Sequence, residues 1–155
     1  MSSARAQANQ SLYLARIQLQ AWADVLEQQQ HPAHVIDRSF AFSVQHHLLD
    51  AFGWYALTVL GETNLPPCPP HRCDDLPGVA DGKSVPGEIR EFQTLEQDGW
   101  LSQLQRELPM TSSPARSPGN LASEVSLLPD QALMSGWADQ LEALFDRMGD
   151  SLDEC

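Results

Sequence analysis

Residues 8–26 read ANQSLYLARIQLQAWADVL, and this stretch decides the fold class. Read as a helix, it carries apolar side chains at alternating spacings of four and three residues, a set we call the main row: Ala8, Leu12, Ala15, Leu19, Trp22 and Leu26. At about 100° per residue such a row occupies one narrow strip of a helix. A strip this regular has to pack against other helices, so the stretch predicts an all-α protein.

The same helix carries a second apolar row, made of Leu14, Ile17, Ala21 and Val25. Two rows on one helix require two helical neighbours, or one neighbour and a partner chain. An apolar row that no helix covers is too large a patch to be without a role. We therefore expect the second row to be the protein's interaction surface if it is exposed.

The rest of the chain predicts three more helices with two long connections. The region that follows the first helix is apolar over most of its circumference, which predicts a central helix, antiparallel to the first. Consecutive prolines forbid regular structure in the next segment, and the apolar residues of the third helix change phase, which predicts a kink near Asp98–Gly99. We expect one domain over 1–155, a four-helix, mostly antiparallel bundle with a long proline-rich loop between its second and third helices. The helices are predicted over 3–29, 33–62, 85–108 and 130–148, the loops over 63–84 and 109–129, and an acidic tail over 149–155.

Charge and composition argue against several classes of partner. The formal net charge is −12, with Lys83 as the only lysine, and an acidic surface repels nucleic acids. No apolar stretch approaches the roughly 18 residues of a membrane span. An odd number of cysteines, three, argues against a disulfide-stapled secreted scaffold and favours the cytoplasm. No cofactor is predicted.

Cys68, His71 and Cys73 form the most suggestive metal-binding motif. Thiolates and imidazole are ligands that Zn²⁺ accepts, but the usual second pair of ligands further along the chain is missing. The alternatives are a proline-stiffened loop with incidental cysteines, or a reversible disulfide between Cys68 and Cys73.

A polar site is also predicted along one edge of the second helix, from Arg38, Ser43, His46, His47 and Asp50. His46 and Asp50 are one helical turn apart, so they can share a metal ion or a hydrogen bond. The alternative for His47 is a satisfied residue of the apolar face. The Glu-x-x-His pairs of di-iron bundles are absent, and no phosphate-binding loop or nucleophile elbow occurs.

Each predicted helix carries one tryptophan: Trp22, Trp54, Trp100 and Trp137. Large aromatic side chains can line a ligand cavity, but at helical spacing they more often fill a core. The sequence leaves both interpretations open.

Residues 8–62 resemble a family of small helical bacterial proteins of unknown function. The resemblance is carried by Asn9, Tyr13, Trp22, Leu48, Gly61 and Glu62. It implies a cytosolic helical protein and brings no catalytic motif.

The surplus apolar surface favours a non-enzymatic interaction protein, that is a small regulatory or adaptor protein that binds a protein partner or associates with itself as a homodimer. Two alternatives remain. One is a metal-dependent or hydrolytic enzyme that uses His46 and Asp50, and the other is a small-molecule binder with a tryptophan-lined cavity.

Overall fold

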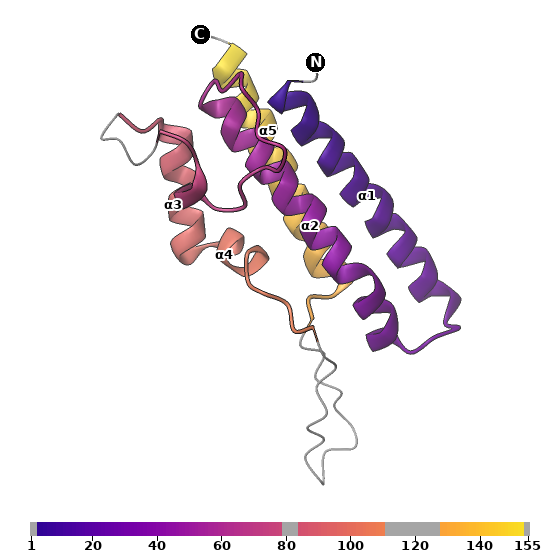
Figure 1. The fold of residues 1–155 in the computed structure, drawn as a ribbon. Helices are drawn as coiled ribbons and strands as arrows, with labels where there is room; N and C mark the ends of the chain where they lie inside the picture. The colour runs from indigo at the N-terminus through magenta and orange to yellow at the C-terminus, as the bar shows by residue number, and fades with distance from the viewer. Residues whose placement is uncertain (1–2, 79–83, 111–127, 154–155) are drawn as a thin grey trace.

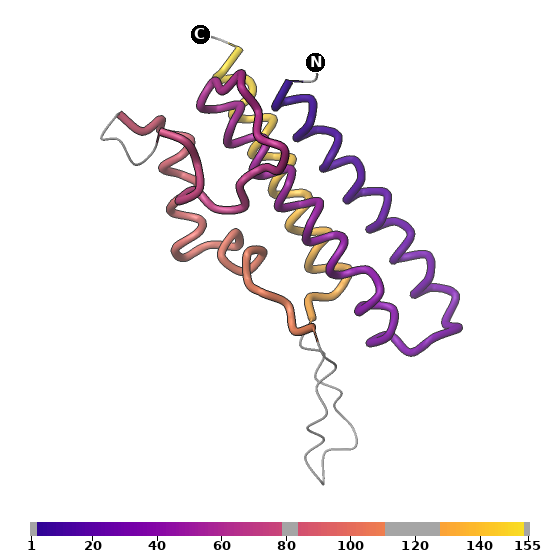
Figure 2. The backbone as a smooth tube through the Cα atoms, viewed as in Figure 1, coloured from indigo at the N-terminus to yellow at the C-terminus, as the bar shows by residue number. Residues whose placement is uncertain are grey.

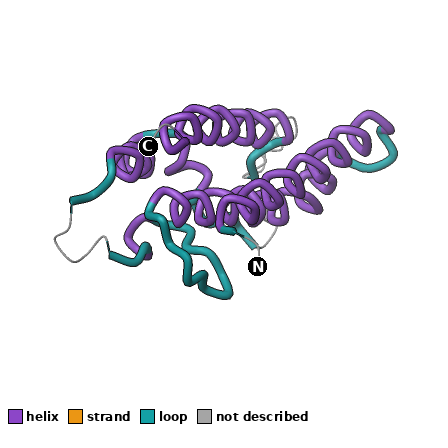
Figure 3. Tube along the Cα trace, turned by 90° about the horizontal axis from the view of Figure 1, so that it is seen from above, coloured by secondary structure: helices purple, strands orange, loops and turns teal. Residues whose placement is uncertain are grey.

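The computed structural model describes residues 3–78, 84–110 and 128–153, and this part of the chain is helical and contains no strand (Figures 1 and 3). The all-α prediction is therefore confirmed. The α-helices are α1 (Ala4–Gln28), α2 (Ala33–Val59), α3 (Gly87–Asp98), α4 (Trp100–Leu104) and α5 (Gln131–Asp153), and one 3-10 turn, η1 (Cys73–Asp75), lies between α2 and α3.

Helix α1 forms where the main row predicted it. The Ser3 hydroxyl caps its start by accepting a hydrogen bond from the Ala6 amide at 3.1 Å. At its other end Gln29 adopts the left-handed conformation, with φ of 54°. The main row is buried from Ala8 to Trp22, and Leu26 packs against the core partly buried.

Helices α1, α2 and α5 lie side by side and enclose most of the core (Figure 2). Helix α1 runs antiparallel to α2, and α5 runs in the same direction as α2 (Figure 1). Arg16 of α1 forms ion pairs with Asp139 and Glu142 of α5, both at 2.7 Å. Tyr55 of α2 stacks on Phe145 of α5 with ring centroids 4.1 Å apart. These contacts fix the lengthwise position of α5 against the helical pair.

The prediction of a single helix over 85–108 is wrong, because the chain breaks at Gly99 into α3 and α4. A Cβ on Gly99 would lie 2.9 Å from the Leu95 side chain and 3.0 Å from the Leu95 Cα and carbonyl oxygen, so the approach is tight for any other residue. The break lies where the kink was predicted. By changing direction, the chain buries Phe92 of α3 and Leu104 of α4, which one straight helix would place on different faces.

The last helix is longer than predicted, since it continues through Gly149 to Asp153. Gly149 does not end α5. Its missing side chain instead makes room for Arg5, whose guanidinium would lie 2.8 Å from a Cβ there. Arg5 pairs with Asp153 of the final turn at 3.0 Å. The predicted acidic tail over 149–155 is therefore helical as far as it is described.

Two smaller predictions have partial outcomes. Helix α2 ends at Val59, three residues before the predicted boundary of 62, and Gly61 follows with a positive φ of 71°. Most of the predicted loop over 109–129 lies outside the described residues.

The second row of α1 is only partly covered. Leu14 and Ile17 are 37% and 49% exposed, whereas Ala21 and Val25 are half-buried. Tyr13 adds a further exposed ring beside them. None of the helices in the described segments is long and apolar enough to cross a bilayer.

Candidate metal centre

After α2 the chain folds back along the helix before it reaches α3 (Figure 1). We call residues 66–76 the docked loop. Its Pro70 carbonyl approaches α2 so closely at Gly53 that a Cβ there would overlap the carbonyl oxygen. Gly53 therefore has a structural reason to be glycine, because only a residue without a side chain lets the backbone of the loop pack directly on α2.

This approach places His71 of the docked loop beside Asp50 of α2. The His71 Nε2 atom lies 2.7 Å from Asp50 Oδ1, and the His46 Nε2 atom lies 3.2 Å from Asp50 Oδ2. The two imidazole rings meet edge to face with centroids 5.8 Å apart. One carboxylate therefore gathers two imidazole nitrogens from two separate segments of the chain.

The cluster is buried on one side and open on the other. The Asp50 side chain is 18% exposed, His71 37% and His46 63%. Because His46 is the most exposed member, any ion held by the three residues faces solvent on that side.

The backbone around His71 is held from the opposite side by α3 and α4. Gln105 Nε2 donates to the His71 carbonyl oxygen at 2.8 Å and to Glu96 Oε1 at 2.7 Å. The same Glu96 oxygen accepts the Cys73 amide at 2.9 Å. His71 is thus positioned between α2 and the Glu96–Gln105 pair.

Within the described residues, His46, Asp50 and His71 are the group whose ligand atoms could hold a metal ion, and these atoms all lie within 4.8 Å of one another. Bonds of about 2.0–2.1 Å to a tetrahedral ion place ligand atoms roughly 3.3 Å apart. The separations from Asp50, 2.7 Å to His71 and 3.2 Å to His46, already lie near that spacing. Two imidazoles and one carboxylate suit Zn²⁺ and neighbouring late first-row ions better than Mg²⁺ or Ca²⁺.

The two cysteines predicted as ligands do not join this cluster. Both are free thiols, Cys68 exposed and Cys73 fully buried. Burial, and next the negative charge of Glu96, raise the pKa of the Cys73 thiol well above its ordinary value. The ligand atoms that lie together are those of His46, Asp50 and His71, so metal binding by Cys68 and Cys73 stays a prediction.

The polar site predicted on α2 is also only partly assembled. His46 and Asp50 converge, but Arg38 turns away to the Met110 carbonyl and lies over the Phe42 ring. Ser43 is half-buried and outside the cluster. The His47 ring meets the His46 ring edge to face. Burial lowers the pKa of His47, and the charge of the nearby His46 lowers it further. His47 therefore fits the alternative of a residue at the boundary of the core.

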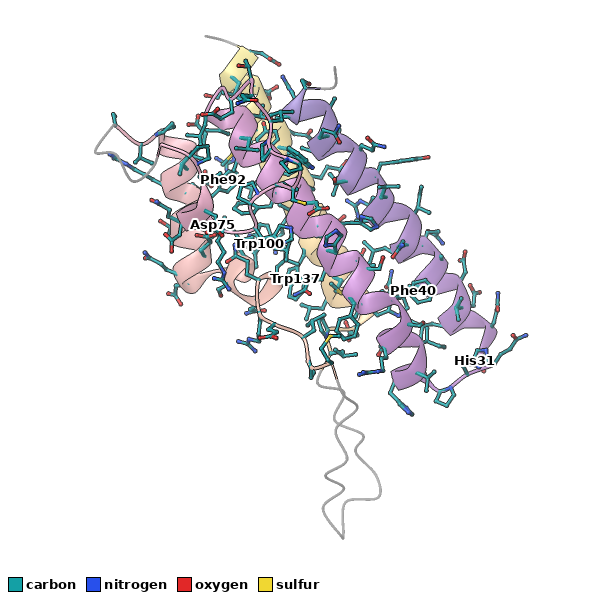
Figure 4. All side chains as sticks on the ribbon, in the orientation of Figure 1. His31, Phe40, Asp75, Phe92, Trp100 and Trp137 are labelled. Atoms are coloured by element: carbon teal, nitrogen blue, oxygen red, sulfur yellow. The ribbon has the colours of Figure 1, made fainter. Side chains whose placement is uncertain are left out.

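The tryptophans mostly fill the core. Trp22, Trp54 and Trp137 are buried, and Trp100 packs against the core partly buried; Figure 4 labels Trp100 and Trp137. Trp137 also borders a hollow of about 450 Å³ beside Leu108 and Leu133. The prediction of a tryptophan-lined ligand cavity stays untested.

The sequence did not point to Glu96 and Gln105, which hold the backbone of His71 and Cys73. Gly53 was the one available signal, since a glycine one turn after Asp50 predicts a close approach of another segment.

Comparison of the chain with protein families, with curated proteins and with solved structures finds no match. The resemblance to small helical bacterial proteins therefore stays a prediction.

Proposed function

We propose that this protein binds one late first-row divalent metal ion, such as Zn²⁺, through His46, Asp50 and His71. The observation that carries the proposal is the convergence of three ligand atoms from α2 and the docked loop within 4.8 Å. Three protein ligands are typical of a zinc site that keeps a position open for water or another ligand. The exposure of His46 supports an open position on the solvent side.

The open position also supports the hydrolytic alternative. A water molecule bound to Zn²⁺ loses its proton far more readily than bulk water, which makes it a nucleophile near neutral pH. Metal binding is the part of this alternative that the geometry supports, and any hydrolytic activity depends on it.

The test is the metal content of protein that has been purified without chelators and without a histidine tag. We expect close to one equivalent of Zn²⁺ or of a neighbouring ion per chain, reduced to background in His71→Ala and Asp50→Asn. His31→Ala is the matched control, because His31 is an exposed histidine at the turn between α1 and α2, away from α3 and α4 (Figure 4). Equal metal content in the wild type and His71→Ala would contradict the proposal.

The second candidate is the interaction protein that the sequence favours, with a second copy of this chain as the partner. Its support is the second row of α1, where Leu14 and Ile17 stay exposed beside Tyr13. A two-fold axis would set this row against its own copy, as in most homodimers. Sedimentation should then give a dimer that Ile17→Glu dissociates, and a monomeric wild type at all concentrations would contradict it. Function as an adaptor or small regulatory protein and a cytoplasmic location stay predictions.

A further inference from the structure

We propose that the metal ion acts as a clamp: its binding at His46, Asp50 and His71 locks the docked loop between α2 and the α3–α4 pair. The inference rests on the proposed metal site and adds what occupancy of that site controls. Metal would set how often the loop leaves its place on α2.

The origin of the three ligands is the first argument. His46 and Asp50 lie one turn apart on α2 and stay together whatever the loop does. His71 comes from the docked loop, 21 residues from Asp50 in sequence. A bound ion keeps all three ligands only while the loop is docked, and a ligand that binds one of two states more tightly shifts the equilibrium toward that state.

The second argument is that the docked loop connects α2 to α3 and α4. On one side it meets Asp50 and Gly53 of α2. On the other side, the amide nitrogen of Gln105 donates to both the His71 carbonyl and the Glu96 carboxylate. Fixing His71 on α2 therefore also fixes the face of the loop against which α3 and α4 pack.

Burial within the loop supplies a probe of its opening. Cys73 has no exposed surface, and Leu76 nearby is 5% exposed. Cys73 lies two residues after His71 in the same loop, so we expect it to become exposed when the docked loop leaves α2. A thiol reagent can reach Cys73 only through such an opening, and the labelling rate reports the population of the open state.

The experiment measures the rate at which a thiol reagent labels Cys73 in the Cys68→Ser, Cys155→Ser background, where Cys73 is the remaining thiol. We expect a saturating concentration of Ni²⁺ to slow this rate by about tenfold or more. In His46→Ala, which removes an exposed ligand, the rate should be the same with and without Ni²⁺. His31→Ala should behave like the wild type. Circular dichroism of each variant establishes that it is folded before labelling.

The other outcomes separate the clamp from the site. If calorimetry detects Ni²⁺ binding that His46→Ala abolishes, but the labelling rate of Cys73 does not change with Ni²⁺, the clamp is contradicted and the metal site stands. If Ni²⁺ slows labelling equally in His46→Ala, the effect does not come from the three-residue site, and the clamp is again contradicted. If the wild type binds no Ni²⁺, the proposed function and the clamp both fail.

Discussion

Gly53 lies directly against Pro70, so closely that a Cβ on Gly53 would overlap the Pro70 carbonyl oxygen. The overlap is with backbone, which cannot move aside as a flexible side chain can. The docked loop thus depends on the absence of a side chain one turn after Asp50.

Gly53→Ala should push the docked loop off α2 and separate His71 from Asp50. We expect the affinity for Zn²⁺ to fall at least about tenfold, by analogy with changes that displace a metal ligand. The matched control is Gly136→Ala in α5, where a Cβ meets no atom within 4 Å. That variant should gain about 0.5–1 kcal/mol of unfolding free energy and keep its affinity. Unchanged affinity in Gly53→Ala, measured by calorimetry, would show that the loop contact does not position His71.

Gln105 is a positioning residue for His71, because its amide donates to the His71 carbonyl. Gln105→Met keeps a similar length without the donor. We expect roughly tenfold weaker Zn²⁺ binding, with no change in the pH dependence that the histidine ligands impose. If the affinity is unaltered while thermal stability falls, Gln105 is a packing residue only.

Asp37 accepts a hydrogen bond from the buried Trp22 Nε1 at 3.0 Å. Asp37→Ala leaves this buried N–H without an acceptor, which costs about 1–3 kcal/mol of unfolding free energy. Asp37→Asn keeps an acceptor oxygen and should be far less damaging. Chemical denaturation of the two variants at pH 7 measures the difference, and equal losses would contradict a role for the hydrogen bond.

The same residue gives a pH dependence of known sign. Burial raises the pKa of Asp37 above its ordinary 3.8, although the Trp22 hydrogen bond opposes the shift. From pH 3.8 up to that raised pKa, the native state binds more protons than the unfolded state, so wild-type stability falls as pH rises. The amide of the Asp37→Asn variant does not titrate and has no such dependence. The stability of Asp37→Asn relative to the wild type should therefore be more favourable at pH 7 than at pH 4, and the reverse order would contradict the assignment.

His47 should make the protein sensitive to acid. Because burial lowers its pKa below 6.5, the unfolded state takes up a proton before the native state does as the pH falls through 6.5. Stability contributed by neutral His47 is present at higher pH and lost below this value. His47→Gln should lose less stability than the wild type between pH 7 and pH 5 in thermal melts. An equal loss in both proteins would assign the acid sensitivity to other groups.

The helices were predictable because their signals are local. The main row of α1 and the cap at Ser3 specify a helix without reference to the rest of the chain. The change of apolar phase predicted a kink near Gly99. It did not predict that the chain breaks into two helices there, because that depends on how closely Gly99 approaches Leu95. The end of α5 was missed because a glycine near the end of an apolar stripe usually ends a helix, whereas Gly149 lies inside α5, beside Arg5 from the opposite end of the chain.

The candidate site was half predictable for the same reason. The spacing of His46 and Asp50 on one helix is a local property, and sequence reasoning found it. His71 was assigned to the neighbouring cysteines, because sequence distance gives no indication that the loop folds back onto α2. Cys73 is buried and Cys68 is exposed, and neither lies with the three clustered ligand atoms; both placements depend on how the docked loop packs.

The most direct test of the central claim is a calorimetric titration of the metal-free protein with Zn²⁺ at pH 7.5, for the wild type and His71→Ala. The account predicts one site per chain in the wild type and an affinity at least about a hundredfold lower in His71→Ala, because a ligand is lost from a set of three. Indistinguishable binding of Zn²⁺ by the two proteins, or no binding by the wild type, would contradict it.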